Sequence, residues 1–219
     1  MNTPIRIILA DDHAIVRAGF RMLLSTDESI AILAEADRGE QACQLYFELL
    51  PDVLVLDLSM PGIGGLESIR RIIHRDPLAK ILVFSVHNEA VYVSRALQAG
   101  AMGYINKNAH PDILLAAIKS LARGEKYIED GLLKTLPGDT PEADYRSIIA
   151  AFSSREFDIF LLLAQGYTIH KIAEEVCLGH KTVANYGTQI RTKLKATTVA
   201  ELAHIAIGLG LMPGGSLER

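Results

Sequence analysis

The chain has 219 residues, of which 49% are hydrophobic, so it can bury the cores of one large domain or of two small ones. Its formal net charge of -4 argues against a general polyanion-binding protein, although an overall figure can hide a local excess of basic residues. The two cysteines show no metal or redox spacing and no apolar segment is long enough to span a bilayer, so we expect a cytoplasmic protein without a membrane partner.

The first half of the chain alternates strand and helix patterns with short connections. Apolar runs of strand length predict five strands, at residues 5–10, 30–36, 53–56, 80–85 and 102–105. Helical spacing of apolar residues predicts a helix after each strand, at residues 14–25, 38–50, 66–75, 89–99 and 110–123. Five such units favour an α/β domain with a doubly wound, five-stranded parallel sheet that is covered by helices on both faces.

Polar side chains stand where four of these strands end, namely Asp11, Asp12, Asp57, Ser85 and Lys107. Because the carboxyl ends of parallel strands meet at one rim, we expect these side chains to gather there. Three carboxylates that close together repel one another unless they share a cation, and hard oxygen ligands suit Mg²⁺. Lys107 and the Ser85 hydroxyl can then bind phosphoryl oxygens, and Asp57 is our candidate nucleophile for an aspartyl phosphate.

Each of these residues also has an ordinary structural interpretation. Asp12 can cap the next helix, and Asp57 can brace the Pro-Gly turn that follows its strand. Ser85 can be an ordinary loop hydroxyl and Lys107 a surface lysine, and for these two residues taken singly we favour that interpretation. Together, in this order and all at strand ends, the residues favour a phosphoryl site.

The motifs ILADDH, VLVLDLSMPGIGG, ILVFSV and AGAMGYINK resemble the receiver domain of two-component response regulators, over roughly residues 5–123. The resemblance implies a flavodoxin-like fold in which Asp57 is the phosphoacceptor. It implies that Mg²⁺ is held by Asp11, Asp12, Asp57 and the backbone carbonyl of Ser59. It also implies that phosphate binding and switching fall to the hydroxyl of Ser85, the aromatic ring of Tyr104 and the ammonium of Lys107.

From residue 124 the pattern breaks. Residues 125–150 mix proline, glycine and acidic residues without a sustained period, which predicts a linker between a domain of residues 1–124 and a second domain of residues 151–212. Residues 213–219 are predicted to be a flexible tail. The second domain is predicted to be a small all-α domain of four helices, in which a capped helix from Ser154 to Gly166 is followed by helices at residues 169–176, 181–194 and 199–209.

The third of these helices carries a local positive charge. Residues 181–195 contain Lys181, Arg191, Lys193 and Lys195 and no acidic residue, which is the pattern expected of phosphate contacts. A helical bundle with a solvated lysine face would show the same charge, and charge alone favours that interpretation. The short turn between the second and third helices, however, is typical of a helix-turn-helix.

The segment SSREFDIFLLLAQGYTIHKIAEEVCLGHKTVANYGTQIRTKL resembles the LuxR-type helix-turn-helix, over roughly residues 152–210. Joined to a receiver, it makes the chain similar to NarL/FixJ-family response regulators. The resemblance implies that the third helix enters the major groove of double-stranded DNA, with contacts from Lys181, Thr182, Asn185, Thr188 and Gln189. The charge pattern adds Arg191 and Lys193 to the predicted DNA contacts. The chain departs from the family at Ala184 and Tyr186, and Gly187 falls inside the helix at a cost of about 1 kcal/mol against alanine, which indicates a close approach or weakened binding.

We therefore expect a transcription factor that is controlled by phosphorylation. A sensor histidine kinase would phosphorylate Asp57, and the phosphorylated protein would form a homodimer that binds specific DNA sequences. The chain would not be an enzyme beyond its own phosphoryl transfer and dephosphorylation. Two alternatives remain open. One is a metal-dependent aspartyl phosphatase, although the DxD spacing typical of such enzymes is missing at Asp57, and the other is a phosphorylation-dependent adaptor whose helix-turn-helix does not bind DNA.

Overall fold

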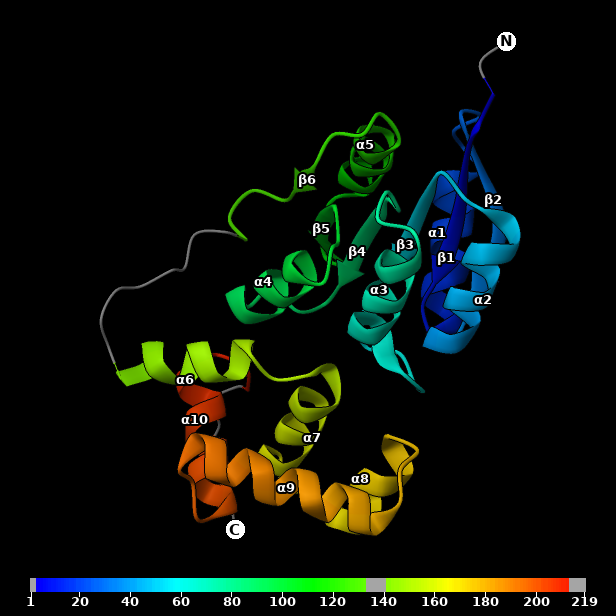
Figure 1. Ribbon diagram of the computed structural model, residues 1–219. Coiled ribbons are helices and arrows are strands. Elements are labelled where there is room, and N and C mark those ends of the chain that lie inside the picture. Colours follow the sequence, from blue (N-terminus) through cyan, green and yellow to red (C-terminus); the bar gives the residue numbers. More distant parts are fainter. Residues whose placement is uncertain (1–2, 133–140, 213–219) are drawn as a thin grey trace. The chain divides into compact units, whose positions relative to one another are not determined.

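The computed structural model describes residues 3–132 and 141–212, and it divides the chain into an N-terminal unit, Met1–Thr135, and a C-terminal unit, Leu136–Arg219 (Figure 1). The division falls inside the segment predicted as a linker. The predicted tail, residues 213–219, lies outside the described residues. None of the helices among the described residues is both long enough and apolar enough to cross a membrane.

The N-terminal unit is built on one parallel sheet with the strand order β2-β1-β3-β4-β5-β6. The strands are β1 (Ile5–Ala10), β2 (Ile30–Ala36), β3 (Val53–Leu56), β4 (Ile81–Ser85), β5 (Gly103–Asn106) and β6 (Tyr127–Ile128). The prediction of five strands was wrong by one, because β6 pairs in parallel with β5 inside the predicted linker. A strand of two residues is too short to show the period on which strand prediction depends.

Five helices connect and cover the strands of this sheet. They are α1 (Ala14–Leu24), α2 (Gly39–Leu49), α3 (Gly64–Arg75), α4 (Ala90–Gln98) and α5 (Pro111–Ala122). Side chains of α1 and α5, such as Leu24 and Ile118, share a buried core with alternate residues of the strands, among them Ile7 and Val55. Helices α2, α3 and α4 lie side by side in chain order and cover the opposite face (Figure 1). The doubly wound α/β fold is thus confirmed.

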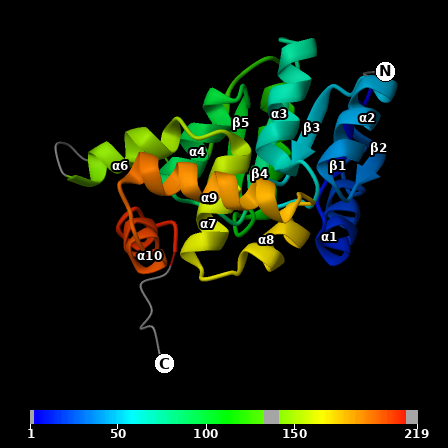
Figure 2. The same ribbon diagram turned by 60° about the horizontal axis from the view of Figure 1, so that its bottom comes forward.

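The regular elements that the structure describes in the C-terminal unit are all helices. It contains α6 (Pro141–Ala150), α7 (Ser154–Ala164), α8 (Ile169–Glu175), α9 (His180–Leu194) and α10 (Val199–Gly208). The last four are the predicted helices, and their bounds differ from the predicted ones by at most two residues. Helix α6 was not predicted, since it lies in the segment assigned to the linker. It packs on α9 and α10, with Ile149 fully buried, while α9 crosses α7 and contacts α8 (Figure 2).

Helix α7 begins with a capping box one residue before the predicted cap. The backbone N–H of Glu156 donates to the Ser153 hydroxyl at 3.2 Å, and the N–H of Ser153 donates to Glu156 Oε2 at 2.8 Å. The pattern S-x-x-E requires the cap to precede the glutamate by three residues, which selects Ser153 and not Ser154. Ser154 is instead buried inside the first turn.

Candidate functional site

The candidate site lies at the carboxyl end of the sheet, where β1 and β3 are neighbours. The chain leaves β1 toward β2 on one side and leaves β3 toward β4 on the other, so the strand order reverses between them. Such a switch point opens a crevice outside the strand ends, where α/β proteins bind ligands. Asp11 follows β1 directly and Asp57 follows β3, and the N–H of Asp57 donates to the carbonyl of Ala10 at 2.8 Å. Both carboxylates are therefore fixed to the same rim.

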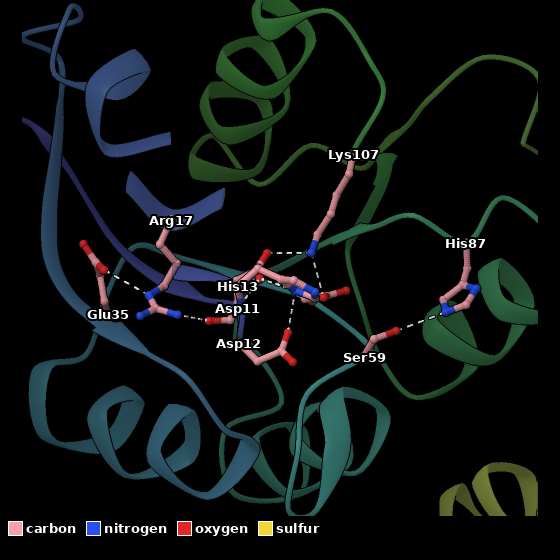
Figure 3. Close-up of polar contacts among 9 residues, drawn as sticks. Asp11, Asp12, His13, Arg17, Glu35, Ser59, His87 and Lys107 are labelled. Atoms are coloured by element: carbon pink, nitrogen blue, oxygen red, sulfur yellow. Dashed lines mark hydrogen bonds and ion pairs between the residues drawn. The ribbon is translucent and has the colours of Figure 1, made fainter. Parts of the chain in front are cut away.

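Lys107 joins these two carboxylates. Its Nζ lies 2.6 Å from Asp11 Oδ2 and donates a hydrogen bond of 2.7 Å to Asp57 Oδ2 (Figure 3). Burial alone would lower the pKa of Lys107, but hydrogen bonds and charge from both carboxylates outweigh it, so the pKa lies above its ordinary value. The ammonium is thus a permanent positive charge that the lysine side chain, only 8% exposed, holds against the rim.

The acidic residues around this lysine could hold a cation. Oxygen or nitrogen atoms of Asp11, Asp12, His13 and Asp57 all lie within 4.8 Å of one another. Asp57 Oδ1 is buried and has no hydrogen-bond partner among the described residues. A buried carboxylate oxygen without a partner is costly unless a ligand satisfies it. The donor set is therefore one that fits a hard divalent cation.

Two glycines bring the chain close enough to the strand ends to form the site. The Pro61-Gly62 turn places Gly62 at a φ of +81°, where a side chain would be strained. At Gly65 in the first turn of α3, a Cβ atom would stand 2.3 Å from the carbonyl oxygen of Asp57. The atoms nearest to this Cβ position belong to the backbone of Asp57 and Leu58 and cannot move aside. Only glycine at position 65 therefore lets the helix start this close to the candidate phosphoacceptor.

The loops after β3 and β4 meet beside the carboxylates. The ring of His87 stacks on Tyr92, with centroids 4.0 Å apart, and its Nε2 lies 3.1 Å from the hydroxyl oxygen of Ser59 (Figure 3). Burial lowers the pKa of His87 against the opposing effect of nearby carboxylates, which favours a neutral ring. No sequence pattern singles out His87, which is a single histidine in a loop.

The two predicted switch residues contact the same loop. The hydroxyl of Ser85, which is fully buried, accepts a weak hydrogen bond of 3.4 Å from the N–H of His87. The hydroxyl of Tyr104 donates to the carbonyl of His87 at 2.7 Å, and the tyrosine ring is fully buried. Ser85 and Tyr104 are thus linked through the backbone of one residue.

Arg17 and Asn106, which no sequence pattern singled out, donate hydrogen bonds to the backbone of loops that carry site residues. The guanidinium of Arg17 donates to the carbonyl of Asp11 and, at 3.1 Å, to Glu35 (Figure 3). The amide of Asn106 donates to the carbonyl of Val86 at 3.1 Å, and its own N–H donates to a carboxylate oxygen of Glu129 at 2.7 Å. These contacts fix the backbone on both sides of the carboxylate pair.

The second candidate site is the outer face of α9. One stripe of the helix, Val183, Gly187, Ile190 and Leu194, is buried against the unit. The predicted DNA contacts lie on the other faces, and all are exposed except Arg191, which is half-buried. Two of them also make contacts inside the unit: Thr188 donates to the carbonyl of Ala184 at 3.1 Å, and Lys193 pairs with Glu156 of α7.

Comparison with known proteins assigns each of the two units to a domain family. The family model of the response regulator receiver domain matches residues 7–119, and that of bacterial regulatory proteins of the luxR family matches residues 150–206. The chain is 37% identical to the transcriptional activator protein ExaE of Pseudomonas putida, over 94% of this chain and 97% of that protein. It is 36% identical to the response regulator UvrY of Escherichia coli strain K12, over 98% and 99%.

A solved structure of similar organisation is that of RcsB from Salmonella enterica serovar Typhimurium bound to promoter rprA in the presence of phosphomimetic BeF₃⁻. It matches with a TM-score of 0.63 and 25% identity, over 93% of this chain and 98% of that one. Together the matches define a response regulator in which a receiver domain precedes a LuxR-type DNA-binding domain. The chain belongs to the NarL/FixJ family of two-component response regulators, as its motifs predicted.

Proposed function

We propose that Asp57 is the phosphoacceptor and that a sensor histidine kinase is its donor. The observation that carries this proposal is the pairing of Asp57 with Lys107, which leaves Asp57 Oδ1 buried without a partner among the described residues. A carboxylate oxygen of Asp57 attacks the phosphorus, and the bond from phosphorus to the donor's imidazole nitrogen breaks. The ammonium of Lys107 then stabilises the transferred phosphoryl oxygens.

The cation of this site is proposed to be Mg²⁺. Asp11, Asp12, Asp57 and the backbone carbonyl of Ser59 would hold it, and it would supply positive charge that offsets the repulsion between carboxylates and phosphate. Arg17 supports this set, because it fixes the backbone carbonyl of Asp11. The proposed function includes no catalytic activity beyond the chain's own phosphoryl transfer and dephosphorylation.

The phosphoryl group changes the contacts of the His87 loop. Its oxygens accept a hydrogen bond from the Ser85 hydroxyl, which now lies against the N–H of His87. When Ser85 turns toward the phosphate, the loop that contains His87 moves. The Tyr104 hydroxyl, which donates a hydrogen bond to the carbonyl of His87, moves with the loop. The receiver is thus a two-state element that one phosphate biases.

The output of this switch is DNA binding in the cytoplasm by a homodimer. Lys181, Thr182, Asn185 and Gln189 form the exposed face of α9, which suits it for the major groove, and asparagine and glutamine suit adenine edges. The relatives support this output: ExaE is a transcriptional activator, and RcsB was solved on a promoter in the presence of a phosphomimetic.

Phosphorylation is tested by incubating the full chain with acetyl phosphate and Mg²⁺. We expect an acid-stable, base-labile adduct that peptide mass spectrometry places on Asp57 and that is lost in Asp57→Asn. The matched control is Asp112→Asn, a carboxylate in the first turn of α5 that is 82% exposed and is not part of the acidic cluster. An adduct on another residue, or one that survives in Asp57→Asn, refutes the assignment.

DNA binding is tested by gel-shift titration against genomic fragments, with and without acetyl phosphate. We expect tighter binding after phosphorylation, an affinity loss for every sequence in Lys181→Ala, and relaxed specificity in Asn185→Ala. Lys126→Ala, an exposed lysine of the receiver, is the control. The absence of any shift at every protein concentration would favour the adaptor that acts through proteins alone.

A further inference from the structure

Two histidines of the helix-turn-helix face each other across its turn. His170 lies in the first turn of α8, and His180 is the first residue of α9. Nδ1 of His170 stands 2.8 Å from Nε2 of His180, and the ring centroids are 4.6 Å apart. Both residues are exposed, so solvent reaches the pair freely.

A carboxylate stands behind one of the two rings. Glu174, one helical turn after His170, places Oε1 at 3.4 Å from His170 Nε2. A carboxylate at this nitrogen favours the tautomer of neutral His170 that is protonated on Nε2, which leaves a lone pair on Nδ1 facing His180. Metal-binding histidines have this arrangement: the nitrogen that does not bind the metal donates its proton to a carboxylate.

From this arrangement we propose that His170 Nδ1 and His180 Nε2 bind one divalent transition-metal ion of the zinc, nickel or copper class. Imidazole nitrogen suits these ions, whereas Mg²⁺ prefers the oxygen ligands of the acidic cluster. Two nitrogens on one Zn²⁺ in tetrahedral geometry stand about 3.3 Å apart, so the exposed rings need to separate only slightly. Water fills the other coordination positions, because the described residues offer no third histidine, cysteine or carboxylate close enough to both nitrogens.

The proposal gives the pair a second role besides a hydrogen bond. A hydrogen bond between two imidazoles requires a proton on one of the facing nitrogens, whereas a metal ion requires a lone pair on both. The bound ion would connect α8 to the first residue of α9 and so restrict the movement of the two helices relative to each other. This site is separate from the acidic cluster of the receiver and does not depend on phosphorylation.

The test uses the whole 219-residue chain, freed of transition metals and kept in excess Mg²⁺ so that the acidic cluster is already occupied. Zn²⁺ is titrated calorimetrically, and Cu²⁺ is used to broaden backbone amide signals by NMR. We expect the wild type to bind one Zn²⁺ ion that His170→Gln and His180→Gln do not bind, with broadening centred on residues 170 and 180. Glu174→Gln should weaken Zn²⁺ binding about tenfold.

His204→Gln is the matched control, since His204 is an exposed histidine of α10 in the same unit. It should bind Zn²⁺ as the wild type does, and circular dichroism checks that every variant folds. The proposal is overturned if the wild type binds no Zn²⁺ in excess Mg²⁺, which would leave the pair as a hydrogen bond only. It is also overturned if binding persists in His170→Gln or is lost equally in His204→Gln.

Discussion

Lys193 of α9 pairs with Glu156 of α7, and the same carboxylate accepts a hydrogen bond from the N–H of Ser153. Glu156 is 8% exposed, and the Lys193 ammonium also lies over the ring of Phe152, 5.4 Å from its centroid. One acidic side chain thus caps α7 and ties it to the helix that is proposed to read DNA. Lys193 was predicted from its charge as a DNA contact, yet its ammonium is already engaged within the unit.

Lys193→Ala tests whether Lys193 stabilises the unit through Glu156 or contacts DNA. Lys193→Ala should lower the free energy of unfolding by up to about 1 kcal/mol, because it removes an ion pair whose lysine side chain is partly exposed to solvent. Lys193→Ala should weaken DNA binding less than Lys181→Ala does, because the ammonium of Lys193 is paired with Glu156 whereas the Lys181 side chain is exposed. Urea unfolding and gel-shift titration of both variants measure this. If Lys193→Ala kept full stability and weakened DNA binding as much as Lys181→Ala, the contact with Glu156 would be incidental.

Acid should destabilise α7 through Glu156. Burial alone would raise the pKa of Glu156, but hydrogen bonds from Lys193 and Ser153 outweigh it and bring the pKa below its ordinary value of 4.5. The unfolded chain therefore takes up a proton at a higher pH than the folded chain, and stability is lost as the pH falls from about 5 through the folded pKa. Amide exchange in α7 should accelerate over this range in the wild type and change less in Glu156→Gln.

Lys107→Met should destabilise the receiver in the absence of Mg²⁺. Breaking a buried ion pair by removing one partner costs about 3 kcal/mol, because Asp11 and Asp57 would lose their common positive charge. Mg²⁺ should therefore raise the melting temperature of Lys107→Met more than that of the wild type. Lys126→Met, at an exposed lysine, is the control. An equal effect of Mg²⁺ on all three proteins would contradict the shared charge.

Two glycines in helices should respond to alanine in opposite ways. Gly65→Ala places a methyl group against the Asp57 carbonyl, so we expect a loss of about 2 kcal/mol and slower phosphorylation by acetyl phosphate. Gly19→Ala in α1 meets nothing within 4 Å and should gain up to about 1 kcal/mol from helix propensity. Thermal unfolding compares them, and a stable, fully active Gly65→Ala would disprove the close approach.

Gly187→Ala should stabilise the C-terminal unit. Gly187 is buried, and a Cβ atom there would stand 3.5 Å from Leu163 Cδ1, which is an ordinary van der Waals contact. Alanine would therefore gain about 0.5–1 kcal/mol of helix propensity without a clash. Because the position faces α7, affinity for DNA should stay unchanged. A loss of stability on urea unfolding would show that α7 and α9 cannot accommodate the methyl group.

The sheet and its acidic rim could be predicted because most of the strands have a clear sequence pattern. Val53–Leu56 is a continuous buried run that ends at a carboxylate, and Ile81–Ser85 ends in the same way at a hydroxyl. Such patterns fix where the strands stop, and the parallel arrangement then brings their ends together. Strand β6 shows no such pattern, since two residues carry no period. Helix α6 was missed because the proline, glycine and acidic residues before and within it are typical of a linker, although Tyr145, Ile148 and Ile149 stand at helical spacing.

The residues that support the site could not be predicted, because their contacts depend on loop geometry. Ser59 and His87 meet although they are 28 residues apart, and neither residue belongs to a periodic pattern. Arg17 lies on an amphipathic helix, where a basic side chain is expected on the solvent side, yet it turns inward to the carbonyl of Asp11. In each case an ordinary surface residue is selected by a backbone group that only the folded chain presents.

Strand β6 limits how two copies of the receiver can associate. An unpaired strand edge is a template for a neighbouring chain, but Tyr127 and Ile128 already occupy the outer edge of β5 (Figure 1). Because Gly103 and Tyr104 of β5 are already paired with β6, a second copy cannot pair its backbone with these two residues. The edge strands of the described sheet are β2 and β6, and β6 offers the backbone groups of only two residues to another strand.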